Sequence, residues 1–162
     1  KGCRVTPTSW VGQRLLRSGD FHEFINSKVQ AVSESHAQAV KVAHASGLKL
    51  LAGTDPVLPD MHGRNYMELV ALIQEGVPPL TAWFGATGLA AEQLGLMDTG
   101  TVVEGRRADL LVCEADVVQD PSRLDNGALV EVMKDGWGYR NGLPAIPQQT
   151  YGKAMNHALG AT

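Results

Sequence analysis

The sequence has 162 residues, of which 44% are hydrophobic, enough for one ordinary domain with its own core. Its formal net charge is only −3 and it holds no block of like charge, which argues against a nucleic-acid partner. Its longest apolar runs fall far short of the roughly 20 residues that span a bilayer, so no membrane-spanning segment is expected.

The first part of the chain predicts a strand, a long helix and a second strand. Cys3–Trp10 suits a short strand that ends in a loop. A helix is expected over about Phe21–Ser46, because this stretch lacks Pro and Gly and repeats apolar residues at helical spacing before Gly47. Leu48–Ala52 follows as a buried parallel strand, and the sequence Gly-Thr-Asp-Pro at residues 53–56 ends it in a loop.

Three more helices are expected before residue 96. Asn65, with Glu68 three residues later, predicts a capped helix start and a helix over about Tyr66–Glu75. A Pro-Pro pair opens the next helix, at about residues 78–86, and Thr87 is expected to cap a short helix that ends at residue 95. The middle of the chain is therefore helical.

A small β module is expected after these helices. Strands are predicted at Thr101–Val103 and Ala108–Cys113 around a Glu-Gly turn, and at Leu129–Met133 and Trp137–Arg140 around an Asp-Gly turn. From Pro144 onward we expect an extended tail. The whole pattern indicates the α/β class.

Asp55 is the most interesting candidate for chemistry. It follows the expected strand Leu48–Ala52, and in barrels of alternating strands and helices the active site lies at the carboxyl ends of the strands. Gly-Thr-Asp-Pro is also an ordinary turn sequence. Position alone leaves a catalytic and a structural interpretation open.

Four segments in order resemble the amidohydrolase superfamily of metal-dependent hydrolases. They are AHASGLKLLAGTDP, MHGRNYMELVALIQEGVPPLTAWFGATGLAAEQLGL, DTGTVVEGRRADLLV and VMKDGWGYRNG. The resemblance runs from about Thr6 to about Gly142 and is nearest to the imidazolonepropionase-like branch, which includes Xaa-Pro dipeptidases, carboxypeptidases and ochratoxin-hydrolysing amidases. It implies the C-terminal part of a (β/α)8 TIM barrel, with strands seven and eight at residues 1–95, strands of a small β-sandwich at 96–143 and a tail at 144–162.

The resemblance also implies an activity, hydrolysis of amide bonds in dipeptides or N-acyl amino acids. Asp55 matches the aspartate that ends barrel strand eight, which binds a divalent metal, expected here to be Zn²⁺ as one or two ions. That aspartate takes a proton from the metal-bound water and passes it to the leaving group, and both steps suit a carboxylate beside a metal. Asp109 is expected to be a structural partner for Arg or backbone groups, not a catalyst.

The other metal ligands of the family have no match in this sequence. The five histidines show neither His-x-His nor HExxH spacing, and His36 and His44, on one face of the long helix, are expected to be partly buried. The two cysteines lie far apart without CxxC spacing. We therefore expect the N-terminal part of the enzyme to come from a separate chain or precursor fragment. We also expect a homo-oligomer. A binding or scaffold module that keeps the fold without the chemistry remains the alternative.

Three residues in the loop after Asp55 are candidates for binding the substrate. His62 is suited to hydrogen-bonding a substrate, and Arg64 to pairing with a substrate carboxylate through two hydrogen bonds. Asn65 belongs to the same family pattern, although a helix cap explains it equally well. The first residues do not form a secretory signal, but they also lack an initiator Met, so the sequence makes no prediction about compartment.

Overall fold

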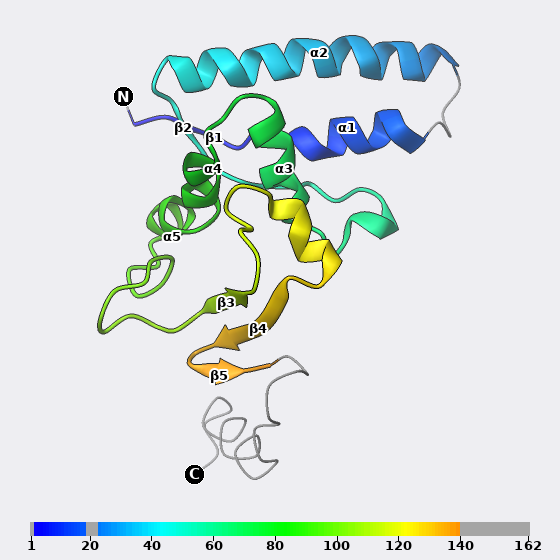
Figure 1. Cartoon of the computed structure of the whole chain (residues 1–162). Helices are drawn as coiled ribbons and strands as arrows, with labels where there is room; N and C mark the ends of the chain where they lie inside the picture. Colours follow the sequence, from blue (N-terminus) through cyan, green and yellow to red (C-terminus); the bar gives the residue numbers. More distant parts are fainter. Residues whose placement is uncertain (1, 19–22, 140–162) are drawn as a thin grey trace.

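The computed structural model describes residues 2–18 and 23–139 and begins with a parallel pair of strands (Figure 1). β1 (Arg4–Val5) and β2 (Lys49–Leu50) are aligned residue by residue. Two helices, α1 (Ser9–Ser18) and α2 (Glu23–Ala45), connect the strands and pack against each other. The expected parallel strand is thus confirmed, although it is shorter than Leu48–Ala52.

The helix α1 is a feature that the sequence analysis missed. It begins at Ser9, inside the stretch expected to be strand and loop, and it contains Gly12, which is unfavourable in a helix interior. Trp10 is 4% exposed and packs in a buried cluster with Met61 and Ala71. Packing of the apolar side of α1 therefore outweighs its weak local propensity.

The helix α2 confirms the long helix predicted from periodicity. It ends at Ala45, and Gly47 follows with a φ of 77°, the left-handed conformation that commonly ends helices. The amide of Leu48 donates to the carbonyl of Ala43 at 3.0 Å, which satisfies one of the last carbonyl groups. The predicted start at Phe21 lies outside the described residues.

Three helices follow β2: α3 (Met67–Gln74), α4 (Pro79–Ala86) and α5 (Gly88–Leu94), with a 3-10 turn, η1 (Pro59–Met61), before them. Their number and order confirm the sequence analysis. The predicted cap of α3 is wrong, whereas Thr87 does occupy the capping position of α5 but makes no side-chain capping hydrogen bond.

At α3 the capping position is Tyr66, which makes no side-chain cap hydrogen bond. The Asn65 amide oxygen instead accepts a hydrogen bond from Thr54, and the Glu68 carboxylate turns to the start of α1. At α5 the Thr87 hydroxyl donates backward to the carbonyl of Trp83. Other partners have taken the side-chain groups that local capping would use, and among them only the partner of Glu68 is distant in the sequence.

The β module is an antiparallel sheet in the order β3 (Leu110–Cys113), β4 (Leu129–Lys134), β5 (Trp137–Gly138), with a 3-10 helix, η2 (Pro121–Asn126), before β4. The Asp-Gly turn between β4 and β5 is present as expected, with positive φ at both residues.

The predicted strand at Thr101–Val103 is wrong, because these residues lie in a loop. The Arg106 guanidinium bonds both the Thr99 carbonyl and the Thr101 hydroxyl, which folds the loop on itself. Arg140 and the tail from Pro144 lie outside the described residues. Among the described residues of this part of the chain, β3, β4 and β5 form one sheet and no partner sheet for a sandwich. The sandwich therefore stays a prediction, as does the domain boundary at residue 95.

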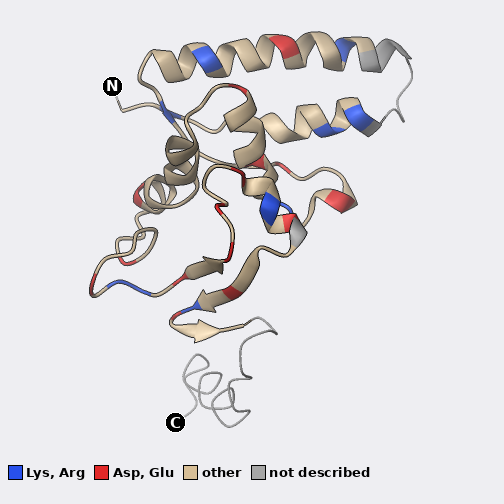
Figure 2. Ribbon diagram, viewed as in Figure 1, with Lys and Arg blue, Asp and Glu red and all other residues tan. Residues whose placement is uncertain are grey.

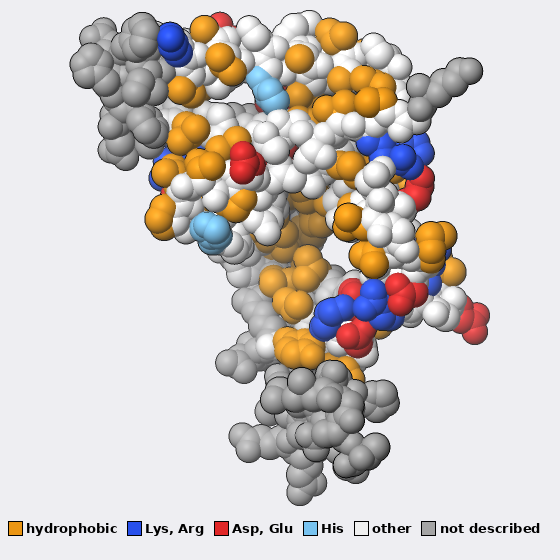
Figure 3. Space-filling model, turned by 180° about the vertical axis from the view of Figure 1, so that it is seen from behind, with side chains coloured by type: hydrophobic (Ala, Val, Ile, Leu, Met, Phe, Trp, Pro, Cys, Tyr) orange, Lys and Arg blue, Asp and Glu red, His pale blue; other side chains and the backbone are white. Residues whose placement is uncertain are grey.

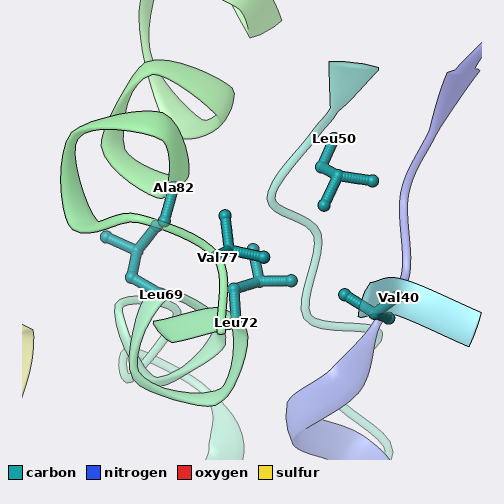
Figure 4. Close-up of a cluster of buried hydrophobic side chains, with 6 residues drawn as sticks. All are labelled: Val40, Leu50, Leu69, Leu72, Val77 and Ala82. Carbon is teal, nitrogen blue, oxygen red and sulfur yellow. The ribbon is translucent and has the colours of Figure 1, made fainter. Parts of the chain in front are cut away.

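The main core lies between the parallel strands and the helices α2, α3 and α4 (Figure 4). Leu72 and Val77, each 1% exposed, lie between Ala82 of α4 and the pair Val40 and Leu50. The amide of Ala52 donates to the carbonyl of Gly85 at 3.2 Å, which ties the end of β2 to α4. The core therefore fixes the segment from which the Asp55 loop emerges.

The charges on the described residues are of both signs and interspersed (Figure 2). One group of them lies over the loop before β3 and the turn after β4, where Arg107 pairs with Asp98 and Lys134 with Asp109 (Figure 3). Asp109 also accepts the backbone amide of Asp135 at 2.9 Å, which confirms its expected structural role. In the described ranges, no helix has the length and apolar character to cross a membrane.

Candidate active site

Asp55 lies in the loop just beyond the carboxyl end of β2. It is exposed, and its φ of 43° places it in the left-handed region, which is uncommon for residues other than Gly. On the neighbouring strand, Thr8 follows β1 in the same region, with a φ of 55°. Both βα loops at this edge thus hold an unfavourable backbone conformation, a feature that clusters at functional sites.

The loop carrying Asp55 is tied to the start of α3. The Thr54 hydroxyl donates to the Asn65 amide oxygen at 3.2 Å. Thr54 and Asn65 also line a mostly apolar pocket of about 360 Å³ that lies between this loop, α4 and β3, with Trp83 and Leu111 on its walls. Asn65 is therefore tied to the residue that precedes Asp55, through a hydrogen bond that was not foreseen from the sequence. Its role in binding a substrate stays a prediction.

Arg64 has a partner within the chain. Its guanidinium forms an ion pair with Asp125 of η2 and also donates to the Tyr66 hydroxyl at 3.4 Å. The pKa of Asp125 is held below its ordinary value, first by a hydrogen bond from Tyr66 and also by the charge of Arg64. The role of Arg64 in binding a substrate carboxylate stays a prediction. It would require Arg64 to exchange Asp125 for the substrate.

His62 lies at the end of η1 and is exposed. His36 and His44 are half-buried on α2, as expected. Within residues 2–18 and 23–139, no three His, Cys, Asp or Glu side chains gather so that they could hold a metal ion. Asp55 provides a single carboxylate, so the described residues by themselves do not fit a metal site. Metal ligation by Asp55 stays a prediction.

A buried polar cluster, which was not predicted from the sequence, joins α3 to α1. Glu68 and Glu75 are 0% and 6% exposed, and both bind the first turn of α1 through Ser9. Their spacing of seven residues on an otherwise apolar helix was the available signal, because it puts both carboxylates on one buried face. From the sequence alone, Glu68 is expected only to take part in capping its helix.

Parallel strands connected by helices, with a carboxylate in the loop at their carboxyl ends, define a mixed α/β protein of the kind that includes barrel hydrolases. Residues 3–138 match the amidohydrolase family, and the chain therefore belongs to this family. This confirms the membership that the four sequence segments predicted. The relatives in this family are metal-dependent hydrolases.

The structure is similar to parts of larger solved structures. A Xaa-Pro dipeptidase with methionine bound in its active site superposes with a TM-score of 0.74 and 28% identity, over 86% of this chain and 35% of the dipeptidase chain. Ochratoxinase from A. niger gives a TM-score of 0.71 and 28% identity, over 86% of this chain and 32% of that chain. Both belong to the branch that the sequence resemblance indicated.

The curated relatives are adenine deaminases. The enzyme of Brucella suis biovar 1 (strain 1330) is 29% identical over 129 residues, 74% of this chain and 20% of the deaminase. The enzyme of Cereibacter sphaeroides (strain KD131 / KCTC 12085) is 29% identical over 115 residues, 71% of this chain and 18% of the deaminase. The chain thus spans about a fifth of these relatives and about a third of the solved structures. Its parallel strands do not close a barrel within the described residues.

Proposed function

We propose that this chain supplies Asp55 to the active site of a metal-dependent hydrolase that cleaves amide bonds in dipeptides or N-acyl amino acids. The observation that carries the proposal is the position of Asp55, exposed and left-handed just past the end of β2, in a member of the amidohydrolase family. On this proposal β1 and β2 are strands seven and eight of a (β/α)8 barrel.

Asp55 is suited to two tasks in such a site. Its carboxylate can bind a divalent cation, for which we propose zinc, and it can accept the proton of an attacking water and return it to the leaving nitrogen. Its exposure leaves both oxygen atoms open to partners from outside this chain. Thr54 and Asn65 hold the loop. His62, which is exposed at the end of η1, is proposed to contact the substrate.

The remaining metal ligands must come from other residues, because the described part of the chain gathers no group of three. We propose that an N-terminal part of the same enzyme, as a separate chain or precursor fragment, completes the barrel and its metal site. The completed enzyme is proposed to be a homo-oligomer.

The test is metal content and hydrolysis of the completed assembly, measured by elemental analysis and by release of free amino acid from a Xaa-Pro dipeptide and an N-acyl amino acid. Asp55→Asn is expected to abolish hydrolysis. Asp60→Asn is the matched control, since Asp60 is an exposed carboxylate of the same loop that pairs with Arg14. Full hydrolysis by Asp55→Asn would refute the role proposed for Asp55. An assembly without metal would refute the proposal and favour a binding or scaffold role.

Deamination of adenine is the second candidate, and the identity of 29% to adenine deaminases favours it. It uses the same carboxylate for the same proton transfer but releases ammonia from a heterocyclic ring. Offering adenine beside the two amide substrates separates the candidates, because ammonia release without amino acid release selects the deaminase.

A further inference from the structure

Glu68 is a buried carboxylate at the junction of α1, α2 and α3. Its two oxygens accept the backbone amides of Ser9 at 2.9 Å and Trp10 at 2.8 Å, the first residues of α1. The first N–H groups of a helix have no partner within the helix, and here the oxygens of the Glu68 carboxyl accept two of them. Glu68 on α3 therefore fastens the beginning of α1.

Glu75 lies in the same cluster. It accepts the Ser9 hydroxyl at 2.7 Å and the Gln13 amide at 3.4 Å. From α2, His36 Nε2 lies 3.3 Å from the same hydroxyl. Side chains from α2 and from the region of α3 therefore meet at Ser9, the first residue of α1. Two acidic side chains are thus enclosed with neutral hydrogen-bond partners around Ser9.

This cluster is connected to the candidate active site through the loop at residues 6–8. The loop runs from β1 directly into Ser9, and Thr8 within it holds its left-handed backbone. Thr6 lies so close to Gly53 that a Cβ there would collide with its methyl group. Gly53 is two residues before Asp55. The position of the start of α1 therefore affects where Thr6 packs against the Asp55 loop.

Two opposing effects decide the charge of Glu68. The backbone amides of Trp10 and Ser9 stabilise its anion, whereas removal from water and the charge of Glu75 disfavour it. Removal from water is the largest effect, and together these raise the pKa of Glu68 from its ordinary 4.5 to about 7. Between about pH 4.5 and 7 the buried site therefore favours the protonated carboxyl, whereas a solvated glutamate is ionised.

We propose that Glu68 is a proton-sensitive latch, a positioning residue that holds the start of α1 and the loop at residues 6–8 against the Asp55 loop when protonated, and that loosens when it ionises. The latch is a property of this chain whatever Asp55 does. Its importance for an active site rests on the proposed function.

The charged groups around Glu68 are few. From α1 it faces neutral side chains, since Arg14 is turned to Asp60. α4 carries no charged residue, and on η2 Asp125 is engaged by Arg64, and Arg123 by Asp120. His36 and Glu75 are therefore the titratable groups of the cluster that must be controlled in a test.

The direction of the pH dependence follows from the difference in the pKa of Glu68 between the closed state and the open state. When α1 lifts from Glu68, the carboxyl meets water and its pKa returns towards 4.5, so the open state binds its proton less tightly. Below pH 4.5 both states are protonated, and above pH 7 both are ionised. Between these limits the opening equilibrium increases with pH, by up to about 300-fold in all.

Hydrogen exchange of the Ser9 and Trp10 amides in the full chain measures this opening. After correction for intrinsic exchange, we expect protection at pH 5 to exceed that at pH 8 by at least about tenfold. The Ala82 amide, which donates to Pro78 within the core, serves as an internal reference with constant protection. Equal protection of Ser9 and Trp10 at both pH values would overturn the proposal.

Three variants assign the titrating group. Glu68→Gln, neutral at every pH, should lose the dependence on pH, whereas His36→Gln should keep it. Glu75→Gln removes the neighbouring charge and should shift the transition to lower pH. Loss of the dependence in His36→Gln, or its persistence in Glu68→Gln, contradicts the latch. If Glu68→Gln does not fold, the pH profile of amide protection in the wild type and its shift in Glu75→Gln still test whether Glu68 is the titrating group. These results are independent of Asp55→Asn, which bears on the proposed function alone.

Discussion

Replacement of Gly85 by alanine tests how closely α4 must approach β2. A Cβ at this position would collide with the carbonyl oxygen of Leu50 and lie 3.4 Å from its carbonyl carbon and 3.6 Å from the Cα of Leu51. These are backbone atoms of β2 and the residue after it, so no side-chain rotation can relieve the contact. The helix would have to move away from the strand.

Two effects of opposite sign act on Gly85→Ala. Alanine gains up to about 1 kcal/mol of helix propensity, whereas overpacking a core typically costs about 1–3 kcal/mol. Because the added Cβ would meet backbone atoms that cannot rotate away, we expect the cost to prevail and the free energy of unfolding to fall by about 1–2 kcal/mol. For a chain of this size, such a loss corresponds to a decrease in Tm of roughly 2–8 °C.

The assay is urea unfolding followed by circular dichroism, with Gly12→Ala as the matched control. At Gly12 in α1, the added Cβ meets only the Ser33 hydroxyl, at 3.3 Å, and this side chain can rotate. We expect Gly12→Ala to be unchanged or more stable by up to about 1 kcal/mol. If Gly85→Ala proves as stable as Gly12→Ala, α4 does not approach β2 as closely as described.

Two further predictions concern the core and the loop after Asp55. Leu72→Ala is expected to lower the free energy of unfolding by about 2–5 kcal/mol in the same assay, because Leu72 is 1% exposed in the main core, and an effect below about 1 kcal/mol would contradict that packing. Tyr66→Phe is expected to raise the pKa of Asp125 towards its ordinary value, because the Tyr66 hydroxyl is the main cause of its lowering. Titration of the Asp125 carboxyl carbon by NMR measures this change, and an unchanged pKa would mean that Arg64 alone holds the carboxylate.

Periodicity and turn residues located most elements correctly. The stretch before Gly47 shows a helical repeat over many residues, and α2 ends at Ala45 as that repeat predicts. The Asp-Gly turn after β4 depends on two residues that tolerate positive φ, and it too is present. These features are local, because a few neighbouring residues decide them.

The helix α1 and the strand predicted at Thr101–Val103 show where local information fails. α1 depends on Trp10 reaching Met61 and on Glu68 meeting its first amides, contacts that join residues about 50–60 positions apart. Thr101–Val103 has strand-forming residues, but Arg106 holds the loop in another shape. In both cases a distant or cross-loop partner outweighed propensity.

By itself, the sequence determined the amidohydrolase family, the order of most helices and strands, and Asp55 as the candidate catalytic residue, because short motifs and local periodicity carry this information. Only the tertiary structure decided that Arg64 pairs with Asp125, that Asn65 bonds Thr54, and that Glu68 is enclosed beneath α1. A side chain's partner depends on which distant segments packing brings within hydrogen-bond reach. Local sequence cannot specify that proximity, and the burial that raises the pKa of Glu68 exists only once the helices have come together.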